Sequence, residues 1–380
     1  LMNKIMKTAL FVCLMAMPLA SCGKKTGRTN ELKPEGVSEI DKHASLSTFG
    51  KALKATTKEG SLSIVTESTK DLSIAFENKI HNTIENTDTA KSGSILAQRV
   101  AADYRISSKD TLGLSFEAGA DLVHWEYNDE NGKASKNRTD VQFSSYVKDE
   151  TFYFDPTNKN FSGLITDLVD VAGYGDYRTL ITVFLSQKYY VAFSDVAELL
   201  TIDLDFAEVF DYLTSYITDD NIDKLIVEAD KHLDEWEWLK AYTLKSNSNE
   251  NVFYASMNKN DLIGFLTVVD SATKEEGEEL TNWSEELANV TIKSLEFVVN
   301  FDKDGLHNFE TVFDLTSEEK GADAYEQDTI PGATSKKIGT QDSKIDIVGG
   351  FKGTFGSNAP KLPSSSGWTN LITVIEGLIE

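Results

Sequence analysis

The sequence predicts an α+β fold: one large curved antiparallel β-sheet, forming an unclosed barrel, with helices packed on one face. Roughly ten segments alternate apolar and polar side chains with the two-residue period of half-buried strands. Helical periodicity is confined to blocks between these segments. The alternation leaves one face of each strand exposed to solvent. This favours antiparallel pairing, because parallel strands are usually buried on both faces.

Composition limits the possible functions. The chain has 380 residues, 40% of them hydrophobic, and a formal charge of −24. This apolar content is sufficient for a folded core. The acidic excess argues against nucleic acid as a partner and against adsorption to anionic lipid. Both cysteines, Cys13 and Cys22, lie near the N-terminus, which excludes disulfides, Cys-based zinc sites and thiol nucleophiles from the rest of the chain.

The first half of the folded region is rich in strand patterns. Within 71–79, Leu72, Ile74 and Phe76 face one side and polar residues face the other. Asn131-Gly132 is typical of a tight hairpin turn. We expect a helix at 40–56, followed by strands at 61–67, 71–79, 95–107, 111–117, 121–128, 140–148 and 151–155.

The second half begins with a helical block at 161–234, which includes helical patterns at 177–188, 195–201, 205–218 and 221–233. Strands are expected at 235–246 and 251–257, then two helices at 258–272 and 278–288. The clearest alternation, in 290–301, turns at Asp304-Gly305 and returns through 309–315. A last strand is expected at 343–354, where the glycine-rich stretch 349–356 indicates either bends or bulges in a curved sheet or a loose strand end.

The N-terminus carries a targeting pattern. Lys4 and Lys7 precede a mainly apolar stretch at 8–20, which is too short to span about 30 Å of hydrocarbon. The stretch ends in Leu19-Ala20-Ser21-Cys22, which resembles the cleavage box of bacterial lipoproteins. The resemblance implies removal of residues 1–21 and a diacylglyceryl anchor on Cys22. The alternative is an ordinary secretory signal that happens to precede a cysteine.

These observations predict the domain organisation and location. Residues 1–21 are the signal peptide, 22–39 a flexible tether, 40–356 one α+β domain, and 357–380 a linker with a short amphipathic tail. The protein is then a bacterial lipoprotein that is anchored in the cell membrane and faces away from the cytoplasm. The membrane is its expected partner, through Cys22.

Catalytic and metal-binding motifs are missing from the sequence. None of the five histidines belongs to an HExxH motif, and no GxSxG elbow or phosphate-binding loop occurs. Asn300-x-Asp302-x-Asp304-Gly305 starts like an EF-hand loop, but Thr311 stands where a bidentate Glu is needed. We therefore predict a non-enzymatic protein with no catalytic residues, metal site or cofactor.

The chain also resembles the LolA/LppX-like group of bacterial lipid carriers. The resemblance rests on the cleavage box at 19–22, on hairpins such as 146–155 and 295–305, and on a helical block between two strand-rich regions. It implies a curved sheet wrapped over helices that holds a lipid or another hydrophobic ligand. The expected inner-face residues of such a cavity are Leu72, Ile74, Phe76, Phe143, Trp236, Trp238, Phe297, Val299, Phe309 and Phe313.

A second interpretation stays open. Trp236 and Trp238 lie on the same face if their segment is a strand, and they either pack in a core or line an apolar cavity. A fully packed core requires the same alternation of apolar and polar residues as a core that encloses a cavity. The alternative function is therefore a cell-envelope interaction or assembly lipoprotein that binds no ligand.

Overall fold

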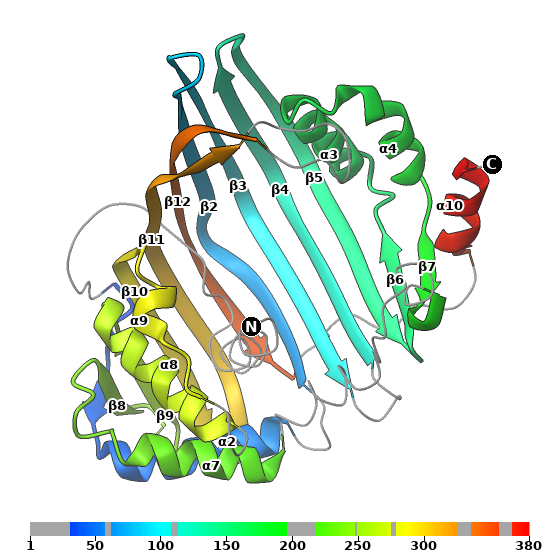
Figure 1. Ribbon diagram of the computed structural model, residues 1–380. Coiled ribbons are helices and arrows are strands. Elements are labelled where there is room, and N and C mark those ends of the chain that lie inside the picture. The colour runs from blue at the N-terminus through cyan, green and yellow to red at the C-terminus, as the bar shows by residue number, and fades with distance from the viewer. Residues whose placement is uncertain are drawn as a thin grey trace.

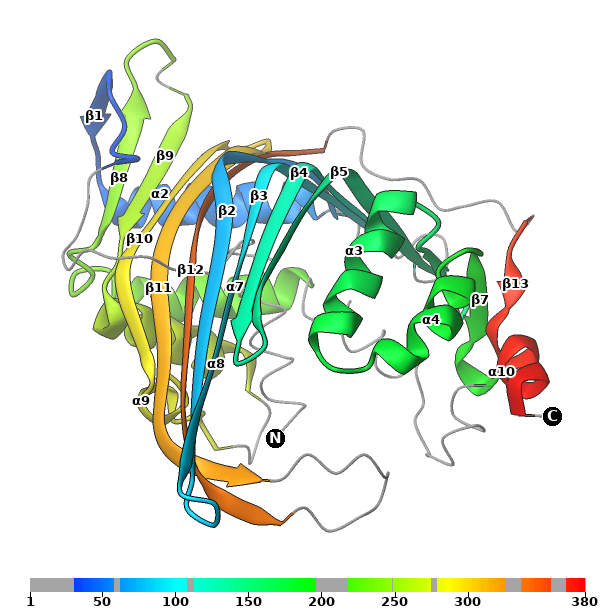
Figure 2. The same ribbon diagram turned by 90° about the horizontal axis from the view of Figure 1, so that it is seen from above.

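The computed structural model describes residues 31–57, 62–107, 113–195, 218–247, 249–274, 279–325, 336–356 and 367–379. They form one 13-stranded sheet that curves strongly but stays open between its edge strands β1 and β13 (Figures 1 and 2). All strand pairs of these residues are antiparallel except β7 with β13. The predicted α+β class with a curved sheet is confirmed.

The sheet consists of two meanders. The strands of the first are β2 (Leu62–Asn82), β3 (Thr87–Ser107), β4 (Gly113–Asp129), β5 (Gly132–Lys148), β6 (Thr151–Asp155) and β7 (Tyr189–Ala192). Those of the second are β8 (Leu239–Leu244), β9 (Asn251–Ser256), β10 (Val290–Asp302), β11 (Gly305–Tyr325) and β12 (Lys337–Phe355). The short strands β1 (Val37–Glu39) and β13 (Thr369–Asn370) form the edges. Pairing of β12 with β2 joins the meanders.

The helices lie on the concave side of the sheet in two groups (Figure 2). At one end, α2 (Lys42–Thr56), α7 (Asp219–Asp230) and α8 (Lys259–Thr273) pack under the second meander, next to the short α9 (Trp283–Glu286). At the other end are α3 (Lys159–Val171), a 3₁₀ turn η2 (Gly175–Tyr177) and α4 (Arg178–Phe184). Helix α10 (Leu371–Ile379) follows β13. Within the described residues, no helix is long and apolar enough to span a bilayer.

Several predicted boundaries were wrong. The two strands expected between 61 and 79 are one 21-residue strand, β2, in which a register shift between Glu67 and Leu72 interrupts the alternation. The strands expected at 111–117 and 121–128 are likewise the single strand β4. Trp236 and Trp238 lie in a turn before β8 rather than in a strand. The helices predicted at 195–201 and 205–218 fall almost entirely outside the described residues.

The boundary of the predicted tether also differs from the structure. Residues 31–39, assigned to the tether, belong to the fold: β1 pairs with β8, and Leu32 and Val37 pack against Tyr242 and Tyr254. At the other end, residues 367–379 form β13 and α10 against β7. The folded body therefore begins before residue 40 and extends beyond residue 356.

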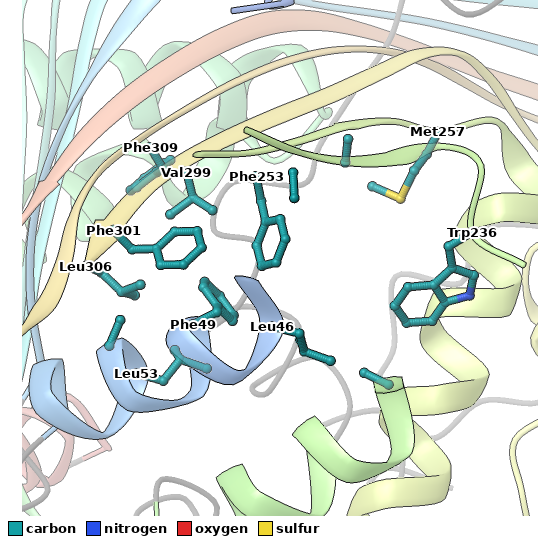
Figure 3. Close-up of a cluster of buried hydrophobic side chains, with 14 of the residues drawn as sticks. Leu46, Phe49, Leu53, Trp236, Phe253, Met257, Val299, Phe301, Leu306 and Phe309 are labelled. Atoms are coloured by element: carbon teal, nitrogen blue, oxygen red, sulfur yellow. The ribbon is translucent and has the colours of Figure 1, made fainter. Parts of the chain in front are cut away.

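The main core lies between the second meander and helices α2, α7 and α8. In Figure 3, Phe49 and Leu53 of α2 point toward Phe253 and Phe301 of the sheet. The Phe49 ring lies edge-on to both, with centroid distances of 5.4 and 5.1 Å. Such edge-to-face contacts add to the burial of apolar surface, which is the main stabilising term of the fold. A smaller cluster packs α3 against β5 and its neighbours.

The glycine-rich stretch lies in β12, where register shifts occur between Val348 and Gly350 and between Gly350 and Phe351. The bulge interpretation of this stretch is confirmed. Gly353 is paired with Phe309, and Gly349 with Phe313. A Cβ atom on Gly353 would lie 2.3 Å from the Phe309 ring. Glycine here leaves room for the aromatic side chains of β11 on the concave face.

Candidate functional site

The candidate site is an apolar cavity of about 100 Å³ between the concave face of the sheet and the helices of the main core. Strands β8 to β11 form one wall, and α2, α7, α8 and the turn before β8 form the others. Its lining residues are apolar apart from one threonine: Leu46, Phe49, Leu225, Ile226, Ala229, Trp236, Trp238, Leu239, Phe253, Ala255, Met257, Phe265, Val268, Leu295, Phe297, Val299 and Thr311.

Helix spacing and capping place the helical lining residues. In α2, Leu46 and Phe49 are three residues apart and share one face. The Asp41 side chain caps this helix by accepting a hydrogen bond from the His43 backbone N–H at 2.8 Å. Helix α8 begins with a capping box in which Asn258 and Asp261 satisfy each other's backbone N–H groups. These caps fix where each helix starts, and hence which side chains face the cavity.

A charged side chain holds the turn that carries Trp236. The Lys42 ammonium at the start of α2 donates hydrogen bonds to the backbone carbonyl oxygens of Leu233 and, at 3.1 Å, of Trp236. Burial, together with the charge of Lys240, lowers the pKa of Lys42. The Trp236 and Trp238 rings pack against each other at a tilt of 33°, with centroids 4.9 Å apart, and each lies 6.1 Å from the Phe265 ring. The turn thus presents two tryptophans to the cavity.

Thr311, the single polar lining residue, uses its hydroxyl group in a hydrogen bond within the sheet. The Thr311 hydroxyl donates to the Glu296 carbonyl oxygen at 2.9 Å in a buried contact. This bond satisfies the hydroxyl donor. The cavity therefore offers almost no polar partner to a ligand, and it suits an alkyl or aromatic group.

The ten residues predicted to line a cavity divide into three sets. Trp236, Trp238, Phe297 and Val299 line it, and Phe309 and Phe313 are buried in the same core cluster without lining it. Leu72 packs at the margin of that cluster. The remaining three, Ile74, Phe76 and Phe143, lie elsewhere.

Those three residues belong to other parts of the concave face. Ile74 and Phe76 of β2 pair with Ile347 and Ile345 of β12 outside the main core cluster, and Phe76 is 36% exposed. Phe143 stacks on Phe161 of α3, with ring centroids 5.0 Å apart. The strand period assigned these side chains to the inner face, but it carries no information about which strands the helices cover.

None of the lining residues of α2, α7 and α8 was predicted as a site residue. Helical spacing of apolar residues could have indicated them: Leu225, Ile226 and Ala229 recur on one face of α7. The same spacing serves any helix packed on a sheet, so it does not distinguish a cavity wall from a filled core.

Charged clusters elsewhere hold the structure together. Asp167 of α3 is fully buried and accepts hydrogen bonds from Lys136 at 2.5 Å and from Arg138 at 2.6 Å. Burial works to raise the pKa of Asp167, but these two cations outweigh it and lower the pKa. Among the residues that the structure describes, no three His, Cys, Asp or Glu side chains are arranged to hold a metal ion.

Comparisons with known proteins add no family assignment. No protein-family model matches the chain, and no curated protein matches it significantly. The geometry of the cavity and the sequence are therefore the basis for a functional proposal.

Proposed function

We propose that this protein is a membrane-anchored, extracytoplasmic bacterial lipoprotein that binds the alkyl part of a lipid or other hydrophobic ligand. The ligand lies between the curved sheet and the helices, and no chemical reaction is involved. The observation that carries this proposal is the cavity of about 100 Å³, whose lining is apolar except for Thr311. An apolar void of this kind excludes water and favours hydrocarbon.

The cavity volume limits what can enter. Sites for drug-sized ligands typically measure about 300 to 1,000 Å³, whereas an engineered apolar cavity of roughly 150 Å³ binds benzene. The cavity thus suits one short alkyl segment. Burying about five methylenes contributes roughly 4 kcal/mol, which alone corresponds to a dissociation constant near 1 mM. A tighter complex requires further contacts for the rest of the ligand.

The open part of the concave face offers such contacts. Between the two helix groups (Figure 2), Phe76 and Ile345 are 36% and 44% exposed, and the half-buried Ile74 and Ile347 lie beside them. These residues of β2 and β12 pair across the strands and share the face that lines the cavity. We infer that a chain whose end enters the cavity continues along this apolar surface.

Filling the cavity tests the proposal. Ala255→Leu and Ala229→Leu add methyl and methylene groups from opposite walls, and both should reduce binding of a fluorescent fatty-acid probe at least tenfold. The same change at the exposed Ala44 of α2 is the matched control and should leave binding unchanged. Thermal melting checks that all three variants fold. Equal probe binding by all variants would refute the cavity as the binding site.

The anchor is a separate part of the proposal, because Cys22 lies outside the described residues. It rests on the box Leu19-Ala20-Ser21-Cys22 after a positive and apolar segment. Mass spectrometry of the mature N-terminus should find a diacylglyceryl group on Cys22 and no residue before it. An unmodified Cys22 or retention of residues 1–21 would contradict the anchor.

One observation favours the alternative function, a cell-envelope interaction lipoprotein without ligand. Four large side chains on η2, α4 and the preceding residue are 43% to 55% exposed, namely Tyr174, Tyr177, Leu180 and Val183. Clustered exposed apolar residues often mark protein-binding surfaces. Replacing Leu180 and Val183 by Ser should abolish an envelope complex in cells, as measured by crosslinking, while leaving probe binding intact. Under the ligand-binding proposal, the cavity-filling variants Ala255→Leu and Ala229→Leu reduce probe binding, whereas the changes at Leu180 and Val183 have no effect on it.

A further inference from the structure

The convex face of the sheet holds a buried carboxylate that binds the chain's own N-terminal segment. Glu296 of β10 is fully buried although its side chain points away from the main core. Its carboxylate accepts hydrogen bonds from the backbone N–H groups of Glu31 at 3.1 Å and Leu32 at 2.8 Å. The Tyr254 hydroxyl donates a third at 3.2 Å. Burial and the adjacent Glu296 charge raise the pKa of Tyr254 to about 12.

Residues 31–39, which we call the N-terminal strap, make further contacts along this face. Leu32 and Val37 pack on a cluster of Tyr242, Val252 and Tyr254. The strap ends in β1, which pairs with the edge of β8, where the Lys245 N–H also donates to the Gly36 carbonyl oxygen at 3.0 Å. The Glu31 carboxylate forms an ion pair with Lys70 of β2. The strap therefore crosses the sheet from the β1 edge inward.

The strap and the cavity lie on opposite sides of the same strands. Tyr254 and Glu296 face the strap, whereas their neighbours Ala255, Leu295 and Phe297 line the cavity. Successive residues of a strand point to opposite faces, so this arrangement follows from the strand period. Glu31, the first described residue, therefore lies on the face opposite the cavity.

We propose that the strap fixes the exit point of the membrane tether on the convex face, so that this face is turned to the bilayer and the concave face with its cavity is turned away. The inference rests on the proposed anchor at Cys22. Nine residue steps connect Cys22 to Glu31, and fully extended they span about 30 Å at most. A flexible chain of that length has a root-mean-square span of only about 17 Å.

This reach is short compared with the sheet. Glu31 and Leu32 contact β10 and β2, which are three and six strands from the β1 edge. At about 4.8 Å per strand, returning to that edge takes roughly 14 to 29 Å, which is between about half and nearly all of the extended tether. Turning the concave face to the bilayer while the strap is docked would therefore use up much of the extended tether, so the docked strap favours the convex face.

Hydrogen–deuterium exchange of the full lipidated chain in detergent tests the docking. In the unmutated chain, the amides of residues 31–32 should be protected. Glu296→Gln leaves one acceptor oxygen and should speed their exchange at least tenfold, whereas Glu310→Gln, on the same face of the neighbouring strand, should not. Unchanged exchange in β3 and β4 shows that the variants are folded. Unprotected amides in the unmutated chain, or equal effects of both variants, would overturn the docking.

Energy transfer to headgroup-labelled lipid in vesicles tests the orientation. Lys352→Cys and Ile345→Cys carry a dye on opposite faces of β12, and the sequence has no other cysteine beyond residue 22. Transfer should be more efficient from position 352 on the convex face. More efficient transfer from position 345 would overturn the orientation. Mass spectrometry showing an unmodified Cys22 would overturn it together with the anchor, while the exchange experiment alone decides the docking.

Discussion

Asp346, a partly buried carboxylate, shows how a single residue can hold neighbouring strands together. Asp346 of β12 accepts hydrogen bonds from Thr316 at 2.6 Å, from Lys293 at 3.3 Å and from Lys344. Burial works to raise its pKa, but these hydrogen bonds outweigh it and bring the pKa of Asp346 to about 2. The cluster joins β10, β11 and β12 across the convex face.

The low pKa of Asp346 predicts a specific acid sensitivity. A carboxylate whose pKa is lower in the folded than in the unfolded state stabilises the fold above the unfolded pKa, near 3.8. That contribution, about 2 kcal/mol, is lost as the pH falls through about 2. The difference in free energy of unfolding between the unmutated chain and Asp346→Asn should therefore shrink by about 2 kcal/mol from pH 6 to pH 2.

Urea unfolding at several pH values measures this difference. Glu130→Gln, in the turn between β4 and β5, is the control and should show no such pH dependence. A difference for Asp346→Asn that stays constant between pH 6 and pH 2 would show that the carboxylate does not carry the charge-dependent stability.

The ion pair of α3 predicts a second residue-scale effect. Asp167 has no exposed side-chain surface and depends on Lys136 and Arg138 for its hydrogen bonds. Removing one partner leaves a buried charge poorly compensated. Arg138→Met should lower the free energy of unfolding by about 2 kcal/mol, whereas Lys133→Met, which breaks an exposed pair with Glu126, should cost under about 0.5 kcal/mol. Equal losses in urea unfolding would contradict the role of Asp167.

At the scale of elements, the glycines of β12 let aromatic side chains of β11 lie flat on the sheet. A Cβ atom on Gly353 would overlap the Phe309 ring, so Gly353→Ala should destabilise the protein by about 1 to 3 kcal/mol. Gly264→Ala in α8 is the matched control, because no atom outside that helix's own backbone lies within 4 Å of its added Cβ. That change should stabilise the protein by up to about 1 kcal/mol.

The Gly353 prediction is checked by a double mutant. Phe309→Leu shortens the side chain that meets the new Cβ, so the cost of Gly353→Ala should be smaller in that background. Strictly additive effects in chemical denaturation would show that the close approach of ring and backbone is not what requires glycine at 353.

Sequence periodicity predicts elements well where alternation is regular, as in β10 and β11, whose turn at Asp304-Gly305 is confirmed. It fails where a bulge shifts the alternation. Between Glu67 and Leu72 the register of β2 changes, and Arg99 on β3 opposite this region has a positive φ of 44°. Four polar residues in this interval look like a loop in the sequence. Only pairing with β3 and β12 on both sides reveals one continuous strand.

At the scale of the whole molecule, the decisive contact is the pairing of β12 with β2, which are far apart in the sequence. Local patterns contain no information on such a pairing, because it depends on which edges remain available after each meander forms. The same limit applies to the cavity. Phe297 and Val299 follow from the strand alternation of β10, whereas Trp236 and Trp238 line the cavity from a turn that was predicted as a strand. The volume depends on how side chains of three helices meet those of four strands.

The central claim, that the space between sheet and helices holds a hydrophobic ligand, is tested most directly by native mass spectrometry of the chain from residue 23 onward, purified without detergent. We expect a second species whose added mass corresponds to a lipid or fatty acid and which is depleted in Ala255→Leu but retained in Ala44→Leu. A single ligand-free species for the unmutated chain, which also stays ligand-free after incubation with lipid vesicles, would contradict the claim.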